Sequence, residues 1–156
     1  MKLLVSAVGQ RMPTWVQTAW SEYSRRFPRG FSLELSEIPM SKRTRNADID
    51  SIRSKEGEAL LCSVPSGFLI IALDECGKQW STAELAREME RWMREERGVC
   101  FLVGGPDGLS LQCRQKAQEV WSLGKLTLPH PMVRAILAEQ LYRAWSITQN
   151  HPYHRK

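Results

Sequence analysis

The sequence contains no apolar run approaching the roughly 20 residues that a helix needs to cross a bilayer. Its first residues also lack the pattern of a secretory leader, a charged and then apolar stretch ending in small residues. Its 156 residues, 42% of them hydrophobic, suffice for one domain with its own core. We therefore expect a soluble, cytoplasmic protein in which residues 1–156 form a single domain.

Residues that bind metals or form redox pairs are scarce. The four cysteines, Cys62, Cys76, Cys100 and Cys113, include no C-x-x-C pair, which excludes a zinc knuckle and a thioredoxin-like motif. We expect reduced and mostly buried thiols, because free cysteine is among the most buried residue types. Two of the three histidines lie at the C-terminus without a carboxylate neighbour, and the third is remote in sequence. We expect no bound metal.

Several catalytic and nucleotide-binding motifs are also absent. Without G-x-S-x-G there is no nucleophile elbow, and without G-x-G-x-x-G or G-x-x-x-x-G-K-[ST] there is no dinucleotide or P-loop signature. The segment GGPDG, residues 104–108, does place three glycines within five residues. Such a segment either brings backbone N–H groups close to a ligand or forms a tight turn with positive φ, and the sequence leaves both open.

Apolar patterns predict five strands alternating with five helices. The expected strands are residues 3–8, 31–38, 68–73, 99–103 and 123–128. The expected helices are residues 13–27, 48–61, 82–97, a short one capped by Ser110, and 132–148. This alternation predicts an α/β fold with a mostly parallel sheet and helices on both faces. Ligands of such sheets bind beyond the carboxyl ends of the strands, here Leu73, the Gly104 loop and residues 128–130.

Charge is unevenly distributed along the chain, whose net charge is +5. Residues 1–56 hold ten Lys and Arg against six Asp and Glu, residues 57–113 hold five against nine, and residues 114–156 hold seven against two. Basic ends around an acidic middle indicate a polyanionic partner such as RNA, because clustered cations gain affinity by releasing counterions from phosphates. A solvated, unevenly charged surface remains the alternative.

The C-terminal region holds most of the reactive side chains. His130 lies between two prolines, which either aim its ring at a strand end or make it part of a rigid turn. The following helix has an apolar surface wide enough for core packing or for a subunit interface. Residues 150–156 then carry an amide, two imidazoles, a phenol and a guanidinium, which predicts a tail that contacts a ligand or partner.

The chain resembles the ribosomal large subunit methyltransferase H family, small bacterial SPOUT enzymes that act on a pseudouridine in 23S rRNA. The resemblance rests on LVGGPDGLS at 102–110, LGKLTLPHPMVRAILAEQLYRAWSI at 123–147 and NHPYHRK at 150–156, and extends to the opening KLLVSAVG. It implies a C-terminal trefoil knot, a homodimer and S-adenosylmethionine as cofactor. It also implies methylation of N3 of pseudouridine 1915 in assembled ribosomes. A non-catalytic ribosome-binding factor, or a SPOUT methyltransferase with another RNA target, remains an alternative.

The resemblance also implies roles for individual residues. Cofactor contacts are expected from Leu73, Gly104, Leu123, Gly124, Lys125, Leu126, Thr127 and Leu128. The candidates for proton transfer and charge stabilisation are His130, His154 and Arg155. RNA contacts are expected from Lys42, Arg43, Arg45, Asn150 and Tyr153, together with the other C-terminal cations. No catalytic metal is needed, because the methyl group of the cofactor is already activated.

Overall fold

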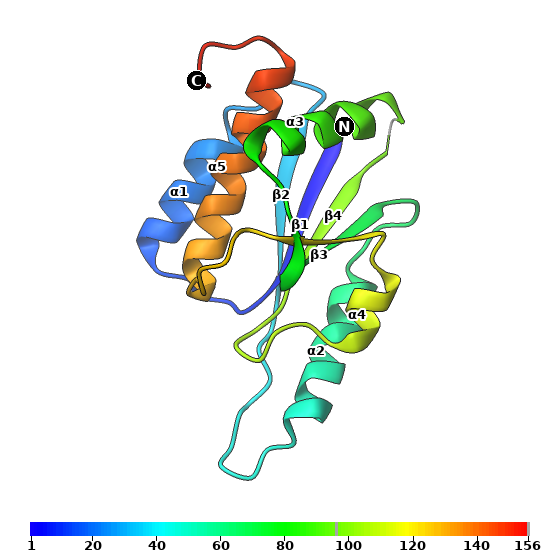
Figure 1. Ribbon diagram of the computed structural model, residues 1–156. Coiled ribbons are helices and arrows are strands. Elements are labelled where there is room, and N and C mark those ends of the chain that lie inside the picture. Colours follow the sequence, from blue (N-terminus) through cyan, green and yellow to red (C-terminus); the bar gives the residue numbers. More distant parts are fainter. Residues whose placement is uncertain (96, 156) are drawn as a thin grey trace.

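Residues 1–95 and 97–155 are described by a computed structural model (Figure 1). Five parallel strands form one sheet in the order β2-β1-β4-β3-β5. The strands are β1 (Lys2–Val8), β2 (Ser32–Ile38), β3 (Leu69–Gln79), β4 (Val99–Val103) and β5 (Glu119–Ser122). The helices are α1 (Thr14–Ser24), α2 (Ile49–Cys62), α3 (Thr82–Arg94), α4 (Leu111–Lys116) and α5 (His130–Thr148). The predicted α/β fold with a parallel sheet is confirmed.

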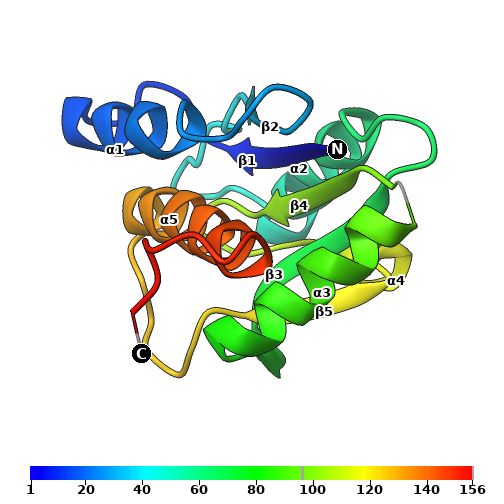
Figure 2. The same ribbon diagram turned by 90° about the horizontal axis from the view of Figure 1, so that it is seen from above.

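The helices cover both faces of the sheet, as the prediction requires (Figure 2). On one face, α1, α3 and α5 pack on a core that includes Leu3, Phe101 and Leu137, all fully buried. On the other face, α2 and α4 enclose a smaller core around Leu60, Leu102 and Cys113. The two central strands β1 and β4 are therefore buried on both sides, which explains why their sequences are continuous apolar runs.

Side-chain caps fix where three of the helices begin. The Ser81 hydroxyl accepts a hydrogen bond from the Glu84 amide at 3.2 Å, and the Glu84 carboxylate accepts one from the Ser81 amide at 2.7 Å. This capping box satisfies two backbone donors that the first turn of α3 leaves free. Asp48 and Ser110 cap α2 and α4 in the same way, through side-chain oxygens. These start signals were predicted from the sequence and are confirmed.

The predicted strand at residues 123–128 is wrong. The fifth strand lies just before it, at Glu119–Ser122, and residues 123–128 form a loop. Trp121 decides the position of the strand, because its ring is buried and stacks on Trp80 with centroids 5.2 Å apart. Leu126, in contrast, is 80% exposed. The leucines of this loop alternate with other residues as in a strand, but the loop pairs with no strand of the sheet.

Two smaller expectations also need correction. Strand β3 does not end at residue 73, as the sequence predicts, but continues to Gln79, and its pairing with β5 shifts register between Leu73 and Lys78. The thiols of Cys62 and Cys76 are exposed, at the end of α2 and in this irregular part of β3, so only half of the cysteines are buried. Burial raises the pKa of the Cys100 thiol to about 12.

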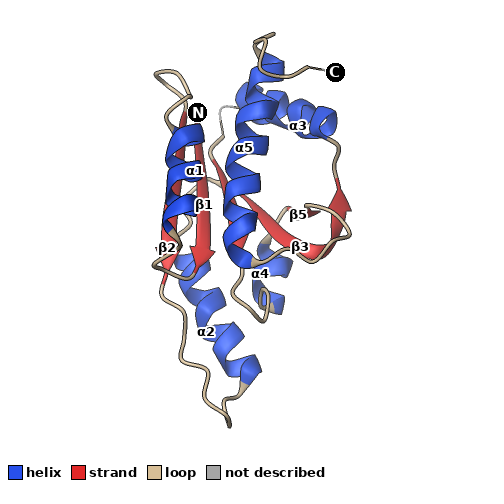
Figure 3. Cartoon of the chain, turned by 90° about the vertical axis from the view of Figure 1, so that its left-hand side faces the viewer, coloured by secondary structure: helices blue, strands red, loops and turns tan. Residues whose placement is uncertain are grey.

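Helix α5 runs along the sheet (Figure 3). Its first turn lies beside the carboxyl end of β1, where the Arg134 side chain donates to the carbonyl of Gly9 at 2.7 Å. The C-terminal tail emerges at the opposite end. Within residues 1–95 and 97–155, no helix is both long and apolar enough to cross a membrane. The trefoil knot implied by the resemblance stays a prediction.

Candidate functional site

The carboxyl end of β4, the irregular part of β3 that begins at Leu73 and the chain that follows β5 line a cavity of about 770 Å³. Its walls come mainly from residues 73–76, residues 103–109 and most of residues 121–130. Arg53 of α2 and Arg114 of α4 complete the lining on the side of the smaller core. Parallel sheets bind ligands beyond the carboxyl ends of their strands, so this cavity is the candidate functional site.

Seven of the eight residues predicted to contact the cofactor line this cavity. They are Leu73, Gly104, Leu123, Gly124, Leu126, Thr127 and Leu128. The eighth, Lys125, is exposed and lies outside the lining. The fold thus gathers three segments that are far apart in sequence, and their contact with a cofactor stays a prediction.

The glycine loop, residues 104–108, forms one wall of the cavity. It contains the tight turn that the sequence left open: the Gly108 amide donates to the Gly105 carbonyl at 2.9 Å, and Gly108 has a φ of +80°. A Cβ on Gly104 would lie 2.5 Å from the carbonyl carbon of Gly108 and 2.7 Å from the Leu109 nitrogen. Glycine is therefore required at 104 by a close approach of backbone to backbone.

The leucine loop, residues 123–128, forms the facing wall. Its start is held by the Ser122 hydroxyl, which donates to the Gly124 carbonyl at 2.9 Å and accepts from the Gly124 amide at 3.2 Å. Gly124 has a φ of +148°, a conformation that favours glycine. Beyond it, Leu128 is half-buried and Leu126 is exposed. The loop therefore presents leucine side chains to whatever enters the cavity.

His130 begins α5 and lines the cavity. Burial and the neighbouring Arg134 guanidinium lower the pKa of His130, and a contact with the Val8 backbone opposes this in part. Its Nε2 lies 3.5 Å from Nη2 of Arg134, which is itself buried and paired with Glu37 at 2.6 Å. A neutral imidazole at neutral pH can accept a proton, so the site contains a base.

An ion pair across the cavity was missed by the sequence analysis. The Asp74 carboxylate lies 3.2 Å from Nη1 of Arg114 and also accepts a hydrogen bond from the Cys76 amide at 2.9 Å. Nothing in the sequence marked Arg114, 40 positions later, as the partner of Asp74, whereas a carboxylate directly after a buried strand was a usable signal.

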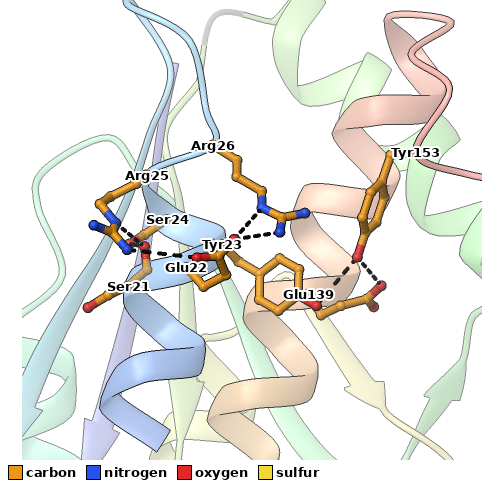
Figure 4. A network of polar contacts seen from close by, with 8 residues as sticks. All are labelled: Ser21, Glu22, Tyr23, Ser24, Arg25, Arg26, Glu139 and Tyr153. Atoms are coloured by element: carbon orange, nitrogen blue, oxygen red, sulfur yellow. Dashed lines mark hydrogen bonds and ion pairs between the residues drawn. The ribbon is translucent and has the colours of Figure 1, made fainter. Parts of the chain in front are cut away.

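The C-terminal tail is held against α5 and α1 (Figure 4). The Tyr153 hydroxyl donates to Glu139 at 3.1 Å, and its oxygen lies 3.4 Å from the Tyr23 hydroxyl. Its ring packs edge-on against Tyr142, with centroids 4.9 Å apart, and lies under the Arg143 guanidinium. Burial and hydrogen bonding raise the pKa of this phenol, which therefore stays protonated. Tyr153 anchors the tail.

None of residues 149–155 belongs to the cavity lining. Glu139, where the tail is anchored, follows His130 by nine positions, about 13 Å along a helix axis. Asn150 is exposed and adopts a φ of +52°, which turns the chain back at the end of α5. Arg155 is exposed, and the buried Nδ1 of His154 has no hydrogen-bond partner among the described residues. Within one chain the tail and the cavity are separate.

The basic segment, residues 40–47, contains both exposed cations and one cation that is paired inside the protein. Lys42 and Arg45 are exposed. Arg43 is not free in the same way, because its guanidinium pairs with Glu56 at 2.9 Å and with Asp107 of the glycine loop at 2.7 Å. Lys156, the last of the predicted cationic contacts, lies outside the described residues.

In the part of the chain that the structure describes, no three His, Cys, Asp or Glu side chains gather as a group that could hold a metal ion. The cavity lining includes the His130 imidazole, backbone groups of the glycine loop, leucine side chains and the pair Asp74 and Arg114. This set suits a small organic ligand that combines an apolar part with charged groups.

Comparison with known proteins points to the same fold. A probable methylase family protein from Haemophilus influenzae Rd KW20 superimposes with a TM-score of 0.53 at 10% sequence identity, covering 99% of this chain and 70% of that one. At this identity the likeness concerns the fold. The family model described as predicted SPOUT methyltransferase matches residues 1–154, almost the whole chain. This chain therefore belongs to the SPOUT methyltransferase family.

Proposed function

We propose that this SPOUT methyltransferase uses S-adenosylmethionine to methylate N3 of pseudouridine 1915 in 23S rRNA, acting on assembled ribosomes as a homodimer. The observation that carries the proposal is the cavity at the strand ends, which joins the glycine loop, the leucine loop and His130. The family supports methyl transfer. The RNA target is supported by the resemblance of the last third of the chain, including the tail.

The cavity fits the proposed cofactor in size and in chemistry. Its volume of about 770 Å³ lies within the range of small-molecule sites. Backbone groups of the glycine loop would bind adenine and ribose, and Leu123, Leu126 and Leu128 would cover the apolar faces. The charged pair of Asp74 and Arg114 would face the amino-acid end. When bound, S-adenosylmethionine supplies a methyl group on a positively charged sulfur, which needs no metal for activation.

His130 is our candidate for the base. N3 of pseudouridine is an imide nitrogen that attacks well only as its proton leaves. Because its pKa is lowered, the His130 imidazole is neutral at neutral pH and can take this proton from N3. The Arg134 guanidinium beside it disfavours a stored positive charge, so the proton is passed on to solvent.

The tail would complete the site from a second copy of the chain. His154, Arg155, Asn150 and Tyr153 do not reach the cavity of their own chain, so their proposed roles require another subunit. Arg155 would then stabilise negative charge on the pyrimidine oxygens, and His154 would relay the proton. Asn150 and Tyr153 would orient the tail and the base.

Recognition of the ribosome would rely on exposed cations. Lys42 and Arg45 project from the basic segment and are free to approach phosphates. Arg43 contributes less to such contacts, because internal carboxylates already occupy its guanidinium.

The proposal is tested by isothermal titration of the purified protein with S-adenosylmethionine, followed by mass mapping of 23S rRNA from cells that lack the protein. Binding of the cofactor and loss of one methyl group at pseudouridine 1915 are expected. Absence of cofactor binding would favour a non-catalytic ribosome-binding factor. Loss of a methyl group at another nucleotide would mean a different RNA target.

A further inference from the structure

Arg43 connects the basic segment to the wall of the cavity. Its Nε donates to Oδ2 of Asp107 at 2.7 Å, its Nη1 to Oε1 of Glu56 at 2.9 Å, and its Nη2 to Oε2 of Glu56 at 3.2 Å. Nη1 also donates to the Ser41 carbonyl at 3.0 Å. All three guanidinium nitrogens are thus committed to acceptors inside the protein, which leaves little of this cation for a phosphate.

Glu56 makes this arrangement costly to disturb. Its side chain is only 3% exposed and accepts hydrogen bonds from Arg43 and from the Ser41 amide. A buried carboxylate that loses its cation is left with an uncompensated charge. The two carboxylates of Glu56 and Asp107 also share one guanidinium, so removing it leaves two negative charges near each other. These carboxylates raise the pKa of Arg43, which stays charged.

The same contacts set the position of the glycine loop. A Cβ on Gly105 would lie 2.9 Å from Oε2 of Glu56 and 3.2 Å from Nη2 of Arg43, so the ion pair packs directly on the loop backbone. Asp107 lies at the tip of the loop and lines the cavity while it accepts from Arg43. Movement of the guanidinium would therefore move a wall of the cavity.

We infer that Arg43 is a positioning residue for the cofactor cavity: it bridges buried Glu56 and Asp107 and thereby holds the glycine loop in its binding conformation. The inference rests on the proposed function, because it takes the cavity to be the site of S-adenosylmethionine. It also separates Arg43 from its neighbours Lys42 and Arg45, which are exposed and have the charge of RNA contacts.

The test measures the affinity for S-adenosylmethionine by calorimetry without any RNA present. Arg43→Gln should weaken binding about tenfold, which corresponds to about 1.4 kcal/mol and is close to the contribution of one hydrogen bond to a charged group. Arg45→Gln, which removes the same charge from the same segment, should leave the affinity within about twofold. Equal affinities for the Arg43→Gln and Arg45→Gln variants would overturn the inference.

Steady-state kinetics separate positioning from a general loss of structure. Arg43→Gln should raise KM for the cofactor while kcat at saturating cofactor stays close to that of the wild type. An increase in KM for ribosomes alone, with unchanged cofactor affinity, would mean that Arg43 contacts RNA and would refute the positioning role. Arg43→Lys, which keeps the charge but not the planar fork, should give an intermediate affinity.

Asp107→Asn keeps the inference testable if the Arg43→Gln variant does not fold, because Asp107 lies in a loop and is not deeply buried. Asp107→Asn should weaken cofactor binding. In the double variant with Arg43→Lys, the loss of binding free energy should be smaller than the sum of the losses in the two single variants. Full additivity would contradict the bridge. If the wild-type protein itself does not bind S-adenosylmethionine, the proposed function fails. In that case, hydrogen exchange of the glycine-loop amides still tests whether Arg43 holds the loop. Exchange should be faster in the Arg43→Lys variant than in the Arg45→Gln variant, and equal rates would overturn the inference.

Discussion

Replacing Gly104 by alanine should damage the cavity with little effect on the rest of the fold. The added Cβ would lie 2.5 Å from the carbonyl carbon of Gly108, 0.9 Å short of the 3.4 Å at which ordinary contact begins. The obstructing atoms belong to the backbone of Gly108 and Leu109, which cannot rotate away as a side chain could. The glycine loop must shift by a comparable distance, and overpacking of this kind costs about 1–3 kcal/mol.

Calorimetry with S-adenosylmethionine and thermal unfolding measure the two consequences of the Gly104→Ala change. We expect the affinity to fall at least about tenfold, because the displaced backbone carries the groups proposed to bind the cofactor. The Tm should fall by roughly 2–4 °C for each kcal/mol lost. Unchanged affinity in a folded Gly104→Ala protein would refute the assignment of the glycine loop as a cofactor wall.

Gly67→Ala is the matched control. Gly67 has a φ of +80° and no heavy atom within 4 Å of its added Cβ, so alanine there costs only backbone strain of about 1 kcal/mol. It precedes β3, at the end of the sheet opposite to the cavity. This variant should be destabilised and still bind the cofactor normally. Equal loss of binding in both variants would trace the effect to stability instead of to the loop.

Three further changes test other parts of the site. Deleting residues 150–156 should abolish methyl transfer and leave the calorimetric affinity for S-adenosylmethionine nearly unchanged, whereas loss of both would make the tail structural. His130→Gln should lower kcat roughly 100-fold. The wild-type rate should be flat near pH 7 and fall only in acid, below the ordinary histidine pKa of 6.5. The reason is that burial lowers the pKa of His130, which works as a base in its neutral form. A wild-type rate that does not fall in acid would exclude His130 as the base. Reversing the charges of Lys42 and Arg45 should weaken ribosome binding and reduce its salt slope by about 2 in a titration at several salt concentrations, and an unchanged slope would exclude this segment.

The fold was largely predictable because its strongest signals are local. Apolar runs marked β1 and β4, and the spacing of Ser81 and Glu84 marked the start of α3. The fifth strand was misplaced because its position depends on tertiary packing: Trp121 is fixed by the ring of Trp80 and by the core, contacts that no local pattern reveals. The more regular alternation lies in the leucine loop that follows.

The sequence predicts the residues that reach the candidate site from the strands of the sheet, but it does not predict the ion pairs around the site. Residues 73–76 of β3 and residues 103–109 gather around the cavity because parallel strands run in the same direction, and the regular pairing of β3 with its neighbours ends beside the end of β4. The partners of Arg43 lie 13 and 64 positions away, so its engagement with Glu56 and Asp107 was invisible in the sequence. The separation of the tail from the cavity likewise follows from where Tyr153 packs on α5.

The central claim is methyl transfer from S-adenosylmethionine to N3 of one pseudouridine in the ribosome. The most direct measurement incubates the purified protein with isotopically labelled S-adenosylmethionine and ribosomes that lack the modification, and then maps the label in 23S rRNA by mass spectrometry. We predict one labelled methyl group per ribosome, on N3 of pseudouridine 1915. No incorporation, or a label on a different nucleotide, would contradict this account.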